Sequence, residues 1–236
     1  MLSKLNETRF FYRIIIYILG LLVLSFGVAF SINARLGVSP VSTLPFVLSR
    51  IFYGSTAPHT SVGMLTTIMM AVFVLLQIAV KRKKFKWINL TQILFSFFFG
   101  FFVDFALFVF GGMQLPTYFG QLAMLAISIV LIAAGICLFM GARLVPLPTE
   151  GFCDAVATES KRLKFHTVKM IMDCVLVLIG IACAVSFLNG GGLQGLQDST
   201  IREGTIISAI AIGKIIPYVR KALRPVLKLT ENPKKA

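Results

Sequence analysis

The chain has 236 residues, of which 57% are hydrophobic and only 14% charged, and its formal net charge is +14. A mean hydropathy of +0.89 is typical of an integral membrane protein, and no polar stretch is long enough to form a separate soluble domain. Because the basic residues gather in short loops between apolar segments, the charge indicates membrane topology and not nucleic-acid binding.

Six apolar segments are long enough to cross a hydrocarbon core of roughly 30 Å. They cover residues 14–34, 61–80, 88–110, 119–140, 167–188 and 204–223. The last is the weakest, because Lys214, Pro217, Arg220 and Lys221 interrupt it. The first is too long for the core of a signal peptide, so we expect a retained helix there.

The loops divide into basic and nearly uncharged ones. Lys and Arg precede the first segment, separate the second from the third and the fourth from the fifth, and follow the sixth, whereas 111–118 and 189–203 carry few charges. Because short basic loops stay in the cytoplasm, this alternation predicts that both termini are cytoplasmic. Residues 224–236 would then form a basic cytoplasmic tail.

The chain contains an internal repeat. The tripeptide Ala-Arg-Leu ends the first apolar segment at 34–36 and the fourth at 142–144. A proline-containing stretch follows each, and a His-Thr pair then precedes the next apolar segment, at 59–60 and at 166–167. Each copy holds three spans, an odd number, so the second copy would be inverted, as in many secondary transporters.

These observations predict the fold class. We expect an all-α membrane protein with six transmembrane helices, arranged as two inverted three-helix repeats at about 14–110 and 119–223. Residues 1–236 would form a single membrane domain.

Each repeat also contains a short excursion between its first and second spans, at about 39–50 and 146–158. The first has apolar residues at helical spacing, and the second has Glu150, Asp154 and Thr158 on one face. Two alternatives remain open. Either both segments are interfacial helices that lie flat on the membrane, or both are re-entrant and line a polar cavity.

Several short motifs resemble the YitT/YczE-like family of bacterial integral membrane proteins. They are Ala-Arg-Leu-Gly-Val-Ser-Pro at 34–40, Glu150-Gly151, Lys169 followed by Asp173, and Glu203-Gly204-Thr205. The resemblance covers roughly residues 14–220 and implies a bacterial inner-membrane protein, with a permease as the suggested activity. It implies no established substrate or catalytic residue. The glycine-rich stretch at 189–195 departs from a strict symmetry of the two halves.

Three charged residues fall inside predicted spans, where charges usually mark a pathway or an internal pair. Asp104 is expected in the outer third of the bilayer, Asp173 in the inner third and Lys214 near the middle. Lys214 could pair with Asp173 or Asp104, bind a solute, or extend towards the interface. Alternatively, Asp173 pairs with Lys169, one turn away, at the cytoplasmic rim.

Two equivalent arginines, Arg35 and Arg143, could each offer a bidentate donor set to an anionic solute or could anchor to lipid phosphate. With the polar residues of the excursions and the intramembrane charges, they complete the candidate set. The candidate substrate-binding residues are Arg35, Ser39, Ser42, Asp104, Arg143, Glu150, Asp173 and Lys214.

Signatures of an enzyme are absent from the sequence. It has no Walker loop, dinucleotide glycine motif or zinc-protease motif, and the four cysteines lack a metal-ligand spacing. We therefore expect no catalytic residues, no metal and no cofactor.

The function predicted from the sequence is a permease that moves a small solute, with an anionic solute as one option, by alternating access. The alternative is a membrane scaffold or regulatory protein that acts through a cytoplasmic partner. The expected partners are the lipid bilayer, an unknown small solute and, as an option, a second copy in a homodimer, but no nucleic acid.

Overall fold

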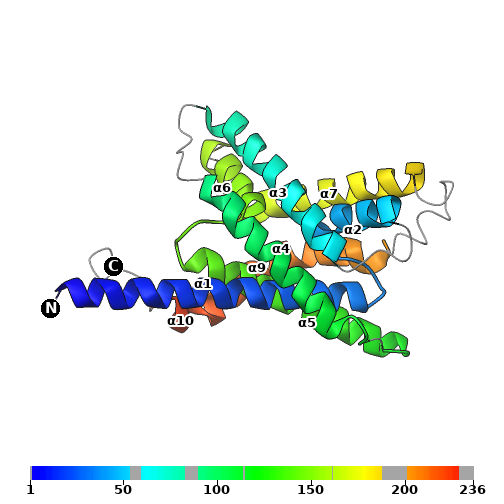
Figure 1. Cartoon of the computed structure of the whole chain (residues 1–236), viewed down its shortest axis with the longest axis horizontal. Coiled ribbons are helices and arrows are strands. Elements are labelled where there is room, and N and C mark those ends of the chain that lie inside the picture. Colours follow the sequence, from blue (N-terminus) through cyan, green and yellow to red (C-terminus); the bar gives the residue numbers. More distant parts are fainter. Residues whose placement is uncertain are drawn as a thin grey trace.

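A computed structural model gives the fold, and it describes residues 2–53, 60–82, 90–113, 115–160, 162–187 and 201–228. Every regular element in these residues is a helix (Figure 1). The long helices are α1 (Leu2–Asn33), α3 (Thr60–Lys81), α4 (Thr91–Phe110), α5 (Tyr118–Gly141), α7 (Phe165–Phe187) and α9 (Glu203–Ala222). The shorter helices are α2 (Pro40–Tyr53), α6 (Pro148–Ser160) and α10 (Arg224–Lys228).

Five helices are long and apolar enough to cross a membrane, which indicates a multi-pass membrane protein. They are Phe10–Asn33, Val62–Lys81, Thr91–Phe110, Tyr118–Gly141 and Phe165–Phe187. The sixth predicted span forms α9, which has 20 residues but carries Glu203, Lys214, Arg220 and Lys221. These charges lower its hydropathy, so the described residues support five spans on length and composition where the sequence predicted six.

The helices α1 and α5 pack against each other in opposite directions. A Cβ atom added at Gly27 would lie 2.7 Å from Ile132, and one added at Gly135 would lie 2.7 Å from Leu24. Contacts therefore move towards the start of α5 as they move towards the end of α1, which makes the pair antiparallel. Because glycine has no side chain, it allows this close approach of two membrane helices.

Helices of the first half pack on helices of the second half. The short helix α2 lies against α7, and the short helix α6 lies against α3 (Figure 1). Helix α4 contacts α1 and α3, and α9 contacts α5 and α7. Gly100 of α4 meets Gly63 of α3, while Gly213 of α9 meets Met170 of α7, so these two glycines occupy corresponding helix contacts.

The two helices that precede the short helices end in the same way. Arg35 and Arg143 adopt the left-handed conformation, with φ of 55° and 52°, which stops a helix and turns the chain. Pro40 and Pro148 then begin α2 and α6, where the fixed φ of proline suits the first helical position. The structure thus bears out the expected short helices after the two Ala-Arg-Leu motifs.

Both short helices begin inside the bundle. Pro40, Ser42 and Thr43 of α2 are buried, as are Pro148 and Glu150 of α6. Met70, Phe99 and Ile212, which lie near the middle of α3, α4 and α9, line the same internal cavity as Pro40 and Glu150. This burial favours the inward alternative over helices that lie flat on a surface.

Several features noted in the sequence lie outside the described residues. They are His59, the basic residues Lys83, Lys84 and Lys86, the glycine-rich stretch 189–195 and the part of the basic tail after Lys228.

Candidate functional site

Three charged side chains form a buried cluster where α6 meets α7. Lys169 Nζ lies 2.7 Å from Asp173 Oδ1 and 3.5 Å from Glu150 Oε1. The three residues are only 1–2% exposed. We call Glu150, Lys169 and Asp173 the charged cluster. Burying charge is costly unless each group is paired, so this arrangement depends on all three members.

The start of α6 holds Glu150 in place. The hydroxyl of Thr149 donates to Glu150 Oε2 over 2.6 Å. Gln77 Nε2 of α3 donates to the carbonyl of Pro148 over 2.9 Å and to Gln92 Oε1 of α4 over 2.8 Å. Two helices of the first half therefore fix the first turn of a helix of the second half.

The other half contributes hydroxyl groups to the same region. Ser39 Oγ donates to Ser42 Oγ over 2.8 Å, and Thr43 Oγ1 donates to the carbonyl of Ser39 over 3.0 Å. Ser39 and the charged cluster line one internal cavity of ≈20 Å³, which is room for about one water molecule. The first turns of α2 and α6 thus meet at one place.

The charges at this place do not cancel. Two carboxylates and one ammonium leave one excess negative charge when all three are ionised. The N-termini of α2 and α6 each add a partial positive charge to the same region. Asp173 Oδ2 and the hydroxyl of Tyr17 are buried and have no hydrogen-bond partner in the described part of the chain. The site therefore offers an unused acceptor at Asp173 Oδ2.

The structure brings four of the eight candidate residues together: Ser39, Ser42, Glu150 and Asp173. Arg143 lines a second, larger cavity. Arg35 is exposed at the end of α1, on a different element from the charged cluster.

The remaining two candidates lie elsewhere. Asp104 Oδ1 accepts a hydrogen bond from the backbone N–H of Gly63 over 2.9 Å, in the first turns of α3. Lys214 is exposed on α9. Of the three alternatives for Lys214, pairing with Asp173 or Asp104 is not formed, because Asp173 pairs with Lys169 and no described ion pair includes Lys214. The alternative pair of Lys169 and Asp173 does form, and both side chains are buried.

Sequence reasoning did not include Lys169 or Thr149 among the candidate site residues. The i,i+4 spacing of Lys169 and Asp173 was visible in the sequence, but no sequence pattern indicated that Glu150 lies beside them. Among the described residues, no group of three His, Cys, Asp or Glu side chains is arranged to hold a metal ion.

The model of a family of unknown function, DUF6198, matches residues 11–221. The chain therefore belongs to this family. No match was found among the curated proteins or among the solved structures. The family match agrees with the expected membership of a family without an established function, while the YitT/YczE-like naming stays a resemblance.

Proposed function

We propose that this member of the DUF6198 family is a carrier that moves a small solute across a membrane by alternating access, with the charged cluster at its binding site. One observation carries the proposal: two short helices from different halves of the chain begin at the same buried, charged place. Secondary transporters commonly bind their solutes where such interrupted helices meet near the middle of the membrane.

An inverted repeat supports this mechanism. The antiparallel contact of α1 with α5 is reciprocal, since Gly27 meets Ile132 and Gly135 meets Leu24. Each short helix packs on a long helix of the other half. Helix α2 packs on α7, which follows α6, and α6 packs on α3, which follows α2. This exchange is expected when two halves are related by an axis in the membrane plane. We include α9 as the sixth span because it packs between α5 and α7 despite its charges.

The proposed location is the bacterial inner membrane, with both termini in the cytoplasm. The basic loops favour this orientation, and the resemblance to YitT/YczE-like proteins favours this membrane. In this arrangement α2 and α6 are re-entrant helices that enter from opposite faces. Their irregular first turns are tolerated at depth because protein surrounds them.

The charged cluster offers a way to couple solute binding to a change of charge. Its excess negative charge and the unused Asp173 Oδ2 favour a bound proton, a cation or a donor group of the solute. The adjoining cavity of ≈20 Å³ holds no more than about one water molecule. A larger solute can therefore occupy the site only after the helices around it move, as alternating access requires.

Ligand-dependent thermal stability of the purified protein tests the proposal. The panel comprises carboxylates, phosphates, amino acids, amines and alkali cations, measured with the parent and with Glu150→Gln. A specific ligand stabilises the folded state by mass action. We expect at least one panel member to raise the Tm of the parent and to lose that effect in Glu150→Gln.

The control variant is Glu159→Gln, which alters an exposed carboxylate on the same helix and should retain the response. A panel without any stabilising member, or an equal response of the parent and Glu150→Gln, would contradict a solute site at the charged cluster. It would favour a role as a membrane scaffold.

A further inference from the structure

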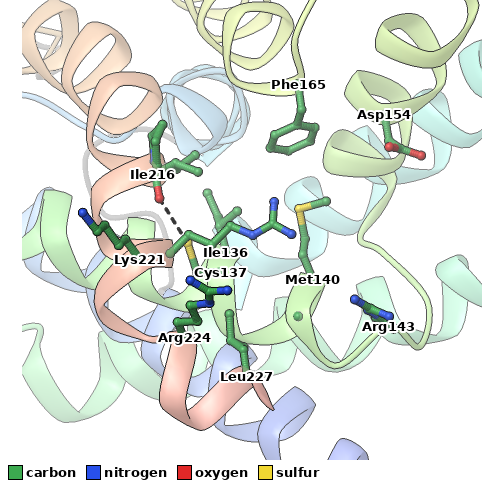
Figure 2. Close-up of a pocket in the computed structure, with 13 residues that line it drawn as sticks. Ile136, Cys137, Met140, Arg143, Asp154, Phe165, Ile216, Lys221, Arg224 and Leu227 are labelled. Carbon is green, nitrogen blue, oxygen red and sulfur yellow. Dashed lines mark hydrogen bonds between the residues drawn. The ribbon is translucent and has the colours of Figure 1, made fainter. Parts of the chain in front are cut away.

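A second cavity, of ≈590 Å³, lies between the C-terminal ends of α5 and α9 and the short helix α10 (Figure 2). Ligand pockets for small molecules commonly measure roughly 300–1,000 Å³. Ile136 lines both this cavity and the central one, so a single side chain belongs to both walls. The larger cavity is of a size to hold an organic molecule without any movement of the helices.

Basic side chains dominate the polar part of this cavity. Arg143 follows α5, Arg220 and Lys221 belong to the last turn of α9, and Arg224 begins α10. Asp154 of α6 is the one acidic side chain on the wall among the described residues. Four cations against one carboxylate leave an excess of three positive charges, and three of the cations come from one short stretch of chain.

The described part of the chain offers Arg220, Lys221 and Arg224 no carboxylate within ion-pair distance. Cations that share a cavity without such partners repel each other and attract anions. Arginine also presents a planar set of donors that matches a phosphate group in a bidentate manner. The positive wall therefore favours an anionic group such as a phosphate.

The rest of the wall is apolar. Met140 of α5, Phe165 of α7 and Leu227 of α10 line the cavity together with Ile136. In Figure 2, Lys221 and Arg224 lie across the cavity from Arg143 and Asp154, and Phe165 closes another side. A hydrogen bond from Cys137 Sγ to the carbonyl of Ile216, at 3.6 Å, joins α5 to α9. The cavity thus combines an anion-binding wall with a surface for hydrocarbon.

We propose that this cavity binds a phosphate-bearing organic anion, whose phosphate is held by Arg220, Lys221 and Arg224 and whose apolar part packs on Met140 and Phe165. The site lies apart from the charged cluster, and its occupancy does not depend on transport. Two sources offer this chemistry: a water-soluble phosphate ester and the headgroup of an anionic phospholipid.

The first arm of the test uses phenyl phosphate and the protein in lipid-free dodecyl maltoside micelles, with binding followed by isothermal titration calorimetry. We expect phenyl phosphate to bind and uncharged benzyl alcohol not to bind. The double variant Arg220→Gln/Arg224→Gln should weaken binding by at least about tenfold, because charge-assisted hydrogen bonds to phosphate are lost. The altered side chains are exposed, so folding should persist.

A matched pair of single variants provides the control. Lys221→Gln removes a cation from the cavity wall, whereas Lys214→Gln removes an exposed lysine of the same helix that does not line the cavity. Only Lys221→Gln should weaken binding of phenyl phosphate. This comparison remains informative if the double variant does not fold.

The second arm uses native mass spectrometry with phosphatidylglycerol or phosphatidylcholine added to the micelles. If the parent retains phosphatidylglycerol, the double variant loses it and phenyl phosphate displaces it, then a lipid headgroup is a source of the ligand. Binding of phenyl phosphate without such retention assigns a soluble ester. The proposal is overturned if neither phenyl phosphate nor phosphatidylglycerol distinguishes the parent from the cavity variants.

Discussion

The short helices α2 and α6 share a backbone plan but differ in chemistry. Each follows an arginine in the left-handed conformation, begins at a proline and has a buried first turn. At the third helical position, α2 carries Ser42 and α6 carries Glu150. The first half therefore brings hydroxyl groups to the centre, whereas the second half brings charge.

The helices behind them differ in the same way. The matching glycine contacts make Gly63 of α3 the counterpart of Met170 of α7. In this alignment, Val62 and Thr66 of the first half correspond to Lys169 and Asp173 of the second. All four of these side chains are buried. The comparison teaches that the two halves share helix contacts, while among the described residues a set of buried charges occurs only in the second half.

The largest expected effect is that of Lys169→Met. This change leaves Glu150 and Asp173 buried without their cation, and breaking a buried ion pair costs roughly 3–5 kcal/mol. We expect a large loss of folded protein in detergent, measured by size-exclusion chromatography and by thermal unfolding. Adding Glu150→Gln and Asp173→Asn to Lys169→Met should recover part of the loss.

Lys214→Met is the control for this prediction, because Lys214 is exposed on α9. Its effect on thermal stability should be small. The sequence offered Lys214 as a partner for Asp173 or Asp104, whereas the difference in burial now makes Lys169 the more sensitive residue. Equal stability of the two variants would contradict the account of the charged cluster.

A second prediction concerns the contact that the two halves share. Gly27→Ala and Gly135→Ala each place a Cβ atom 2.7 Å from the partner helix, and overpacking typically costs ~1–3 kcal/mol. Both variants should lose stability by similar amounts in denaturant titrations, because the two contacts are reciprocal. Gly112→Ala, which has open space around it, should be close to neutral; a strong effect of only one glycine would argue against equivalent halves.

A third and smaller effect is expected for the carboxylate of the first half. Asp104 accepts from the N–H of Gly63 near the start of α3, and a hydrogen bond to a charged group contributes about 1.5–3 kcal/mol. Asp104→Asn keeps an acceptor, so the free energy of unfolding should fall by no more than about 1.5 kcal/mol, as measured by thermal unfolding. Any ligand found for the parent should still bind Asp104→Asn but not Asp173→Asn; loss of binding in both would give Asp104 a role at the site.

The sequence was sufficient to predict the long helices and the short helices α2 and α6 in their order, but not α10, which lies in the stretch expected to be a basic tail. Hydropathy and the repeated Ala-Arg-Leu and proline motifs determine these features locally. It was insufficient for Glu150 and Lys169, because their contact joins α6 to α7 and depends on how far α6 enters the bundle. The exposure of Lys214 was also not predicted, since a position along a segment does not say which face of the helix points outwards.

The central claim is that the buried site is reached from opposite faces in turn. Val28 and Ile136 both line the central cavity. They occupy equivalent positions in the two halves, because Val28 precedes Arg35 and Ile136 precedes Arg143 by seven residues. Ile136 also lines the large cavity, whereas Val28 does not.

The most direct measurement is the labelling of Val28→Cys and Ile136→Cys with a membrane-impermeant thiol reagent. Each variant is made in a cysteine-free background and placed in oriented proteoliposomes. We predict that Ile136→Cys reacts from the face that bears Arg143 and Arg224, and that Val28→Cys reacts from the opposite face only. Reaction of both from one face, or of neither from any face, would contradict alternating access.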